Sequence, residues 1–303
     1  MQQRSITDEI KYQWKYGGVL IRLIGINLAV FILIGVITVF GRLMYGEANN
    51  PVIPFINELF TLHGNFQGFI RRPWGLFTSI FSHFELFHFL FNMIFLYFAG
   101  LMFLRYFSSS RLLYTYVLGG LLGGLFQIIA YSVFPALQGV PTYVLGASGS
   151  VMAIFMAVAF YRPMEEVMLF GVFRLKMIFI AGAFILIDLM RLGTMDNVAH
   201  FAHLGGIAFG IWSIQKLNHP NNVITWTQRL LENTKRKFKK QPKMKVRKGG
   251  KPKNYIRSDD DFKAYQKAKQ EEIDAILDKI SKSGYDSLTK KEKETLFNQS
   301  KNG

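Results

Sequence analysis

The chain has 303 residues, half of them apolar and 29 of them Phe, and its formal net charge is +16. Residues 216–303 hold 23 Lys and Arg against 11 Asp and Glu, whereas the first 215 residues carry a net charge of only +4, so we expect a lipid-facing region followed by a water-facing basic region. Because the chain contains no Cys, disulfides, thiol nucleophiles and Cys-ligated metal sites are excluded.

Six apolar segments meet or approach the length of about 20 residues that a helix needs to cross a bilayer. They are 18–40, 84–104, 112–134, 144–161, 176–190 and 197–215. The first lacks a small-residue cleavage pattern, which indicates a retained span rather than a signal peptide. The last three are short or polar for lipid-facing helices, so we expect other helices to surround them. The sequence therefore predicts an all-α membrane protein with a six-transmembrane-helix bundle.

Basic residues fall in alternate loops of this predicted bundle. They are Arg4, Lys11 and Lys15 before the first span, Arg105 and Arg111 after the second, Arg162, Arg174 and Lys176 after the fourth, and the basic tail after the sixth. The positive-inside rule places these segments in the cytoplasm, which predicts a multi-pass protein of the cell membrane with both termini cytoplasmic. The first outer loop, 41–83, also holds Arg residues, but long loops count less in this rule.

Two loops and two glycine patterns give further expectations. Loop 41–83 is long and aromatic, which predicts interfacial helices, and 165–177 alternates around a central Gly, which predicts a short interfacial hairpin. Glycines four residues apart allow two helices to approach closely. They occur as Gly119 with Gly123, Gly120 with Gly124, and Gly206 with Gly210, and we expect them to be packing positions rather than parts of a site.

Several polar side chains lie at membrane depth, where ionisable groups are rare and usually functional. They are His83, His88, Asn92, Ser148, Ser150, Asp188, His200 and His203. Ser148 stands in Gly146–Gly149, at the predicted head of a helix, where a backbone amide faces developing negative charge. A serine needs a neighbouring base to become a nucleophile, and histidine is suited to that task near neutral pH. A lone serine in a membrane helix, however, more often bonds to its own backbone.

His203 shares a helix face with Gly206 and Gly210, so it is well placed to meet a serine on a neighbouring helix. His88 and Asn92 are four residues apart and share a face, where they are able to donate to an oxyanion or merely to join helices. His83 is expected to be a structural hydrogen-bonding group. We prefer His203 to His200 as the base because His203 directly precedes the glycine pair. Asp188 is a candidate third triad member that would orient a histidine, but we disfavour this role because Asp188 is expected at the outer end of its span, where water can solvate it.

Taken together, these motifs resemble the rhomboid intramembrane serine proteases. The resemblance rests on His83, His88 and Asn92 in H-x4-H-x3-N, then G-x-S-G at Gly146–Gly149, then A-H-x-G-G-x3-G at Ala202–Gly210, in this order on separate spans. It covers about residues 18–215. The sequence differs from the family at Trp74, which Gly75 follows where Arg is frequent, with Arg71 and Arg72 upstream, and at Met152, where an aromatic residue is common.

The resemblance implies a catalytic dyad of Ser148 and His203 without an acidic third member. His88, Asn92 and the amide of Ser148 would form the oxyanion site, with Gly146 beside the substrate. The implied substrates are transmembrane helices of other proteins, cut near the membrane surface, and no metal or organic cofactor is implied. Two alternatives stay open: a catalytically silent protein of the same fold that binds transmembrane helices, and a histidine-lined metal site or transporter, which the lack of Cys and of H-E-x-x-H disfavours.

The remainder of the chain is polar. We expect a cytoplasmic segment at 1–17, a protease core at 18–217, a basic flexible linker at 218–258 and a small helical hairpin at 259–303. Residues 235–257 hold 12 basic residues and no acidic one, which favours anionic lipid headgroups as partners; no nucleic acid is expected. In the hairpin, an apolar stripe precedes Gly284, and Thr289 with Glu292 forms a capping box. The stripe consists of Ile273, Ile276, Leu277 and Ile280.

Overall fold

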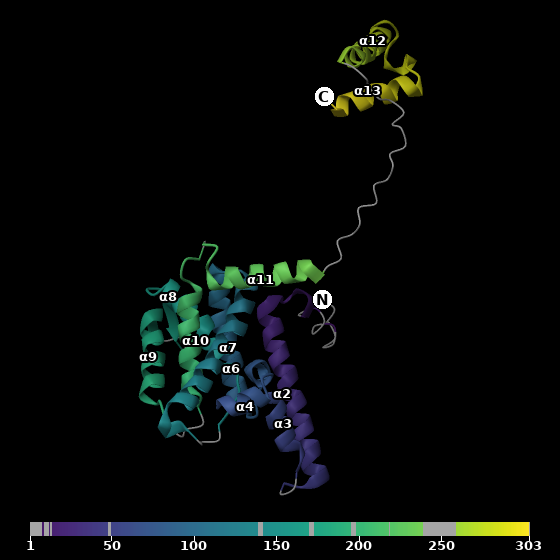
Figure 1. The fold of residues 1–303 in the computed structure, drawn as a ribbon. Helices are drawn as coiled ribbons and strands as arrows, with labels where there is room; N and C mark the ends of the chain where they lie inside the picture. The colour runs from purple at the N-terminus through teal and green to yellow at the C-terminus, as the bar shows by residue number, and fades with distance from the viewer. Residues whose placement is uncertain are drawn as a thin grey trace. The chain divides into compact units, whose positions relative to one another are not determined.

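The structure, a computed structural model, describes residues 8, 12, 14–47, 50–138, 142–169, 173–194, 198–217, 219–238 and 259–302. The chain divides into two compact units, Met1–Lys239 and Lys240–Gly303. The first unit is a helical bundle that carries two small two-stranded sheets (Figure 1). Most of the expected segment 1–17, with Arg4 and Lys11, lies outside the described residues, as do residues 239–258.

The first unit consists of helices joined by short strands and turns. In chain order its elements are α2 (Gly18–Tyr45), α3 (Val52–Phe60), β1 (Leu62–His63), α4 (Phe66–Arg71), α5 (Gly75–Thr78), the 3₁₀ turn η1 (Ser79–Phe81), α6 (Leu86–Tyr106), α7 (Ser109–Val133), the 3₁₀ turn η2 (Pro135–Leu137), β2 (Tyr143–Val144), α8 (Ser148–Tyr161), β3 (Glu166–Leu169), β4 (Phe173–Lys176), α9 (Met177–Met190), α10 (His200–Ser213) and α11 (Val223–Phe238). The fold is thus mostly helical, as the sequence predicts.

A helix lies at each of the six expected spans. Of these, α2, α6 and α7 are long and apolar enough to cross a membrane. Helices α8, α9 and α10 have 14 residues each, or about 21 Å at 1.5 Å per residue, which is less than a typical hydrocarbon core. The six helices are therefore confirmed, whereas the crossing of a bilayer by all six stays a prediction.

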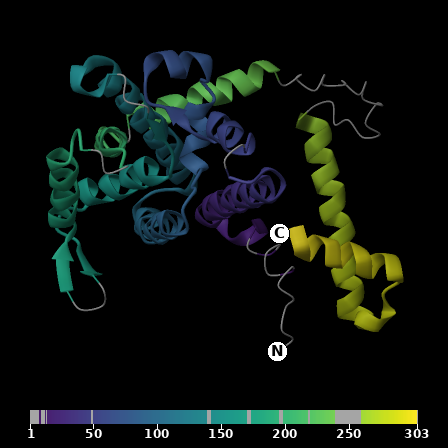
Figure 2. The same cartoon turned by 90° about the horizontal axis from the view of Figure 1, so that it is seen from below.

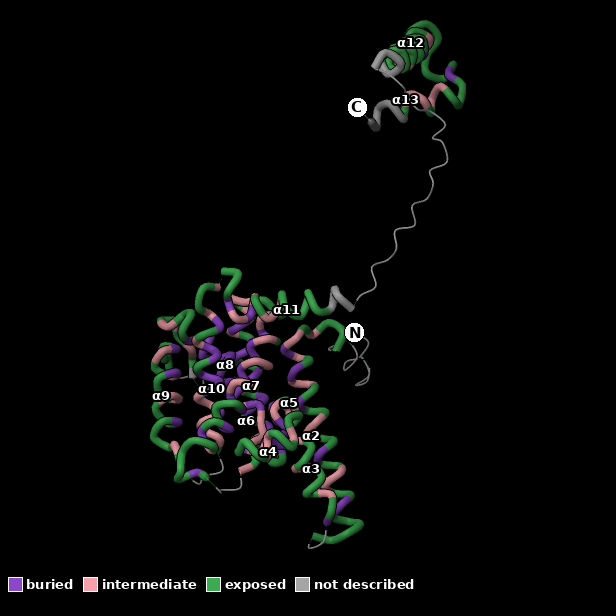
Figure 3. The backbone as a smooth tube through the Cα atoms, viewed as in Figure 1, coloured by how far each residue is buried: buried purple, intermediate pink, exposed green. Residues whose placement is uncertain are grey.

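Helix α8 lies in the centre of the bundle, where α6, α7 and α10 surround it (Figure 3). Every residue from Gly149 to Ala159 is buried. Helices α2 and α9 lie at opposite edges, where their apolar side chains remain exposed (Figures 1 and 2). This arrangement explains how α8 tolerates small and polar residues: its environment is protein rather than lipid.

The glycines of α7 and α10 lie where helices make their closest contacts. A Cβ added to Gly206 would collide with the carbonyl oxygen of Gly149, and one added to Gly210 would collide with that of Ala153. On α7, a Cβ at Gly123 would collide with the carbonyl oxygen of Ala202 on α10. The prediction that these glycines are packing positions is confirmed, because any larger residue would force the helices apart.

The first loop contains short helices, as expected, and also a strand that the sequence did not indicate. Strand β1 pairs with β2 in antiparallel register, with Leu62 opposite Val144 and His63 opposite Tyr143. The amide of Gly64 continues the ladder by donating to the carbonyl of Thr142 at 2.9 Å. The first loop is thereby attached to the segment that leads directly into α8.

The expected hairpin at 165–177 is confirmed by strands β3 and β4, which pair from Glu166 with Lys176 to Leu169 with Phe173. It lies at the periphery of the bundle next to α9 (Figure 2). Its central Gly171 lies outside the described residues. The interfacial position of this hairpin stays a prediction.

A buried polar network joins three parts of the bundle that are distant in sequence. The Tyr116 hydroxyl on α7 donates to the carbonyl of Ile80 at 2.8 Å and accepts from the Asn27 amide of α2 at 2.9 Å. The same amide group donates to the carbonyl of Leu23 at 2.8 Å. Asn27 and Tyr116 are both fully buried. Because an unpaired polar group would be costly there, the network holds α2 and the first loop against α7.

The expectation of a linker over 218–258 is wrong for residues 223–238, which form α11. This helix crosses one end of the bundle (Figure 1). Its N-terminal part is held by Ile224, which is 1% exposed, and by the hydrogen bond from Gln228 to Ser110 at 3.0 Å. A composition rich in basic residues did not prevent the helix, whose N-terminal end packs on α7 and α10, whereas Trp226, Leu230 and Leu231 remain exposed.

The second unit is the expected small helical hairpin, built from α12 (Asp259–Ser283), the 3₁₀ turn η3 (Tyr285–Ser287) and α13 (Lys290–Asn302). Gly284 ends α12 with a positive φ of 77°, a conformation that glycine adopts without strain. Of the predicted stripe, Ile273 and Ile276 are buried and Ile280 is half-buried. Leu277 is 48% exposed, which corrects the prediction for that residue.

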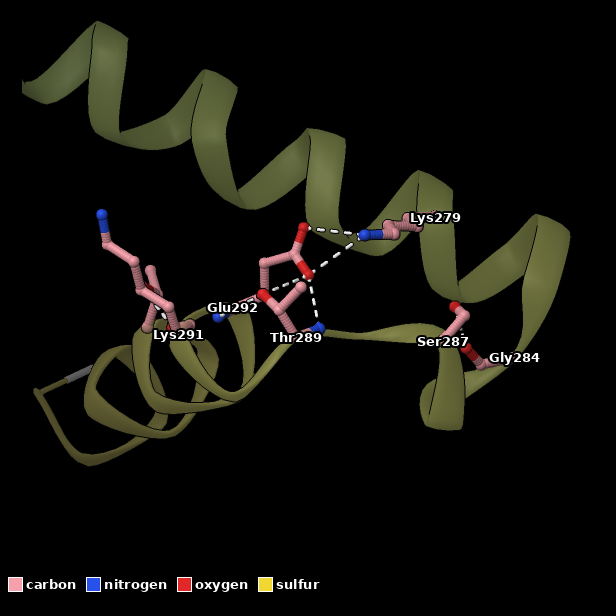
Figure 4. A network of polar contacts seen from close by, with 7 residues as sticks. Lys279, Gly284, Ser287, Thr289, Lys291 and Glu292 are labelled. Carbon is pink, nitrogen blue, oxygen red and sulfur yellow. Dashed lines mark hydrogen bonds and ion pairs between the residues drawn. The ribbon is translucent and has the colours of Figure 1, made fainter.

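The predicted capping box of α13 is confirmed (Figure 4). The carboxylate of Glu292 accepts from the amide and the hydroxyl of Thr289 at 2.6 and 2.8 Å, and from Lys279 of α12 at 3.0 Å. These contacts, with the Thr289 amide as the largest cause, lower the pKa of Glu292 to about 2. One carboxylate thus caps α13 and joins it to α12.

We predict that Tyr116→Phe lowers the free energy of unfolding by about 1–3 kcal/mol, because the Ile80 carbonyl and the Asn27 side chain lose a partner inside the bundle. Denaturation in detergent measures the change. Tyr114→Phe is the matched control, since its hydroxyl makes no hydrogen bond in the described part of the chain. An unchanged stability of Tyr116→Phe would show that the network does not stabilise the bundle.

We predict that acid loosens the second unit. Because the pKa of Glu292 is lower in the folded chain than in the unfolded one, its stabilisation is complete above about pH 4.5 and declines as the pH falls toward about 2. Hydrogen exchange of the α12 and α13 amides in the full chain measures this loss. Glu292→Gln should remove this part of the pH dependence, whereas Glu294→Gln should preserve it; equal behaviour of the two variants would contradict the prediction.

Candidate active site

The turn before α8 is held by three contacts that leave the first amides of the helix available. The Gly146 amide donates to the carbonyl of Ser79 at 2.9 Å, and the Ala147 amide donates to Nε2 of His83 at 3.2 Å. The Val151 amide donates to the carbonyl of Ala147 at 2.9 Å, as the first helical bond. The amides of Ser148 to Ser150 have no acceptor within the helix. Ser148 therefore begins α8, as predicted, where an anion is favoured.

Gly146 is required by this turn. Its φ of +117° is a conformation that other residues rarely adopt. A Cβ at this position would also lie 2.8 Å from Cε1 of His88. The sequence predicts Gly146 beside the substrate, and the structure gives it this additional role of admitting the His88 ring.

The start of α8 lies against α10. The carbonyl oxygen of Gly149, one residue after Ser148, faces the Cα of Gly206, which lies one turn after His203. Ser148 is half-buried and lines a cavity of about 20 Å³, with Ser79, Gly146 and Ala202 among the other lining residues. Within the described residues, no hydrogen bond joins Ser148 to His203. The structure thus brings together the turns that carry the two predicted residues, with their hydroxyl and imidazole not hydrogen-bonded to each other.

Asp188 does not lie in the solvated position expected from the sequence. It is 4% exposed, and its Oδ1 accepts from Nδ1 of His203 at 2.9 Å and from Nδ1 of His200 at 2.7 Å. Because a carboxylate oxygen only accepts, Nδ1 of His203 carries the proton, and Nε2 is the basic nitrogen of the neutral ring. These contacts could not be predicted from the apolar residues that flank Asp188 in the sequence, because they depend on how α9 packs on α10.

His88 lies close to the start of α8, whereas Asn92 is engaged in its own helix. The His88 ring contacts Gly146 and stands edge-on to the His83 ring, with 5.1 Å between the ring centroids. The Asn92 amide donates to the carbonyl of His88 at 2.8 Å. An amide has two hydrogens, so one remains for a second acceptor. His88 therefore lies beside the turn that the oxyanion hypothesis requires, whereas the hydrogen bond described for the Asn92 side chain lies within α6.

The prediction that His83 is a structural hydrogen-bonding group is confirmed by its bond with the Ala147 amide. The first loop supports the same turn through Arg72, which pairs with Glu58 and donates to Nε2 of His63 at 2.9 Å. Burial, followed by the charge of Arg72, lowers the pKa of His63. The neutral ring can accept from Arg72 and stands in β1, which pairs with β2.

The first loop has Gly75 after Trp74, where Arg is frequent in the rhomboid family. The contacts of Trp74 and Arg72 explain how the loop is held with this difference. The indole of Trp74 donates to the carbonyl of Glu58 at 3.0 Å, and Arg72 pairs with the side chain of that same residue. Gly75 is needed after Trp74, because a Cβ there would collide with the carbonyl oxygen of Thr61. Met152, which stands where an aromatic residue is common, is buried in α8.

One group of side chains has the composition of a metal site. The ligand atoms of Asp188, His200 and His203 lie within 4.8 Å of one another. Two imidazoles and a carboxylate suit several divalent ions. The same atoms are already joined by hydrogen bonds, which require a proton on each Nδ1 where a metal would need a lone pair. The hydrogen-bonded arrangement therefore accounts for the cluster without an ion.

Two parts of the chain match known protein families. Residues 71–218 match the Rhomboid domain, and residues 257–302 match a family of unknown function (DUF6576). The chain is 34% identical over 144 residues to RHOMBOID-like protein 12, mitochondrial, of Arabidopsis thaliana. That similarity covers 44% of this chain and 43% of the relative, so the chain spans less than half the length of that curated protein. Residues 71–218, which contain Ser148, His203, His88, Asn92 and Asp188, are thus the part of the chain that is similar to the Rhomboid domain.

Proposed function

We propose that the chain is an intramembrane serine endopeptidase that cleaves transmembrane helices of other membrane proteins, with Ser148 as the nucleophile and His203 as the base. The proposal is carried by the contact of Gly149 with Gly206, which holds the head of α8 against the turn of α10 that bears His203. A nucleophile at a helix N-terminus and a base with a free Nε2 are the groups that acyl transfer requires.

The chemistry follows from these groups. Ser148 Oγ attacks the scissile carbonyl carbon while its proton passes to Nε2 of His203. That proton then goes to the leaving amine as the peptide C–N bond breaks and an acyl-enzyme ester forms. A water molecule gives its proton to the same nitrogen and attacks the ester carbonyl carbon. His203 then passes that proton to Ser148 Oγ as the ester C–O bond breaks, which releases the new carboxyl end and restores the enzyme. The reaction needs no metal and no organic cofactor.

The oxyanion is proposed to lie between the first amides of α8 and the side chains of His88 and Asn92. The amide of Ser148 is in the first turn, where the helix dipole adds to the hydrogen bond. The His88 ring contacts Gly146, two residues before the nucleophile. Gly146, without a side chain, lets a substrate backbone approach this position.

A multi-pass topology with both termini in the cytoplasm is supported by contacts at one end of the bundle. Arg105, after α6, pairs with Glu165, after α8, at 3.5 Å. Arg111, at the start of α7, contacts Asn222, just before α11. The segments after α6, after α8 and before α11, which the positive-inside rule assigns to the cytoplasm, therefore lie at one end of the bundle. Six crossings would place these alternate connections on the same side of the membrane.

Anionic headgroups of the cell membrane are the proposed partners of the basic tail. Helix α11 lies at the same end of the bundle and exposes Arg229 together with Trp226 and Leu230. An exposed Trp beside basic residues suits the boundary between headgroups and acyl chains. We propose no nucleic-acid partner for this segment.

The rival function is a catalytically silent protein that binds transmembrane helices. Such a protein needs the packing of α8 on α10, but it does not need a nucleophile or a base. The presence of Ser148 and of a histidine with a fixed tautomer favours the protease. Loss of the nucleophile separates the two functions.

We predict that Ser148→Ala and His203→Ala each abolish cleavage of a model transmembrane substrate in reconstituted vesicles. A fluorophosphonate should label wild-type Ser148, label His203→Ala far more slowly and leave Ser148→Ala unlabelled, because the hydroxyl needs a base. His219→Ala, a substitution of a histidine past α10, is the control and should keep wild-type activity. Cleavage by Ser148→Ala at the wild-type rate would end the proposal.

We predict that His88→Ala lowers kcat by about 10²- to 10³-fold, the usual effect of removing one oxyanion donor. Asn92→Ala should have a smaller effect, because its amide is partly engaged with the His88 carbonyl. Rates of cleavage at saturating substrate in vesicles measure both. If His88→Ala changes KM and leaves kcat unaltered, His88 does not stabilise the transition state.

A further inference from the structure

The carboxylate of Asp188 occupies a position that its own helix does not favour. It is 4% exposed and lies in the last turn of α9, where the negative end of the helix dipole repels an anion. Burial of a carboxylate is costly unless partners compensate for the lost water. The partners that the structure describes for it are the two imidazoles of α10. The reason for an acid at this position therefore lies in those histidines.

We propose that Asp188 is the third member of a Ser148, His203 and Asp188 triad, and that it acts as a positioning residue on His203. This inference rests on the proposed protease function. Oδ1 of Asp188 holds Nδ1–H of His203 at 2.9 Å, so the ring is fixed in the tautomer whose Nε2 can take the serine proton. When that proton arrives, the carboxylate stabilises the imidazolium cation in surroundings that screen charge weakly.

His200 completes the arrangement without being the base. Its Nδ1 donates to the same oxygen at 2.7 Å, and its ring stands edge-on to that of His203 with 6.0 Å between the ring centroids. It is 5% exposed, whereas the His203 side chain is 12% exposed. A second donor satisfies the carboxylate further and keeps it oriented while the charge on His203 changes. His200 thus holds Asp188, and Asp188 holds His203.

A purely structural tie and a catalytic metal centre are the two rival roles of this cluster, and each has its own consequence. If Asp188 merely joins α9 to α10, its loss should lower stability and leave the chemical step of the remaining folded protein intact. If the three side chains hold a catalytic metal, exhaustive chelation should lower the rate and a divalent ion should restore it. The triad instead predicts that loss of the Asp188 carboxylate slows the chemical step of the folded protein, and that chelation leaves the rate unchanged.

The test compares Asp188→Asn, which keeps the size of the side chain and removes its charge, with Asp188→Glu, which keeps the charge. We expect Asp188→Asn to lower kcat by about 10²- to 10⁴-fold with KM changed by less than about threefold, and to slow fluorophosphonate labelling of Ser148 in parallel. Asp188→Glu should recover part of both rates. Thr115→Val removes a buried hydroxyl of α7 that has no partner among the described residues and should keep wild-type activity.

A measurement on the unmodified protein keeps the inference testable if the variants fold poorly. In wild type labelled with ¹⁵N-histidine, the imidazole signals of His203, assigned with His203→Gln, should show Nδ1 protonated and Nε2 free. Protonation at Nε2 would overturn the triad, as would an Asp188→Asn rate within threefold of wild type or a rate that chelation removes. If wild type is labelled and active and Asp188→Asn is equally active, the triad is contradicted while the proposed function stands. If Ser148→Ala cleaves the substrate, the proposed function itself is contradicted.

Discussion

The close approach of α8 to α10 is the constraint on which the rest of the first unit depends. Gly149 and Gly206 let two backbones meet where any side chain would separate them. In a bundle with little hydrophobic drive between helices, such contacts are a main source of helix association. They also bring a helix N-terminus, with its unpaired amides, against the turn that bears His203. Packing and chemistry therefore depend on the same residues, and a larger side chain at either glycine would disturb both.

The helix that carries Ser148 also needs an entry of defined geometry. The turn is held by the Ser79 carbonyl and the His83 ring, and strand pairing of β2 with β1 fixes the segment before it. Arg72 and His63 tie β1 to the short helices of the first loop. A loop distant in sequence thus orients the start of α8, where the proposed nucleophile Ser148 lies. The long loop is part of the site rather than a connector, which agrees with the functional role that long loops commonly have.

Local sequence signals predicted local structure well. The glycine spacings, the hairpin at 165–177, the capping box of Thr289 with Glu292 and the role of Gly284 all depend on residues within a few positions of one another. The features that were missed depend on distant contacts. Strand β1 has only two residues and exists because β2 lies beside it, and α11 is fixed by its packing on α7 and α10. Leu277 fits a helical stripe, but α13 does not cover it.

Asp188 shows why the contacts of this site are harder to predict from the sequence than its proposed nucleophile and base. Ser148 and His203 are marked by glycines at fixed spacing, whereas Asp188 stands alone in an apolar helix, and its burial depends on the angle at which α9 meets α10. A buried carboxylate destabilises a bundle unless donors face it, and two imidazoles from one helix do so here. A protein that only bound helices would be more stable with an apolar residue at that position. A costly anion against a histidine one turn from Gly206 is therefore the physical ground on which we propose a hydrolase rather than a catalytically silent protein of the same fold.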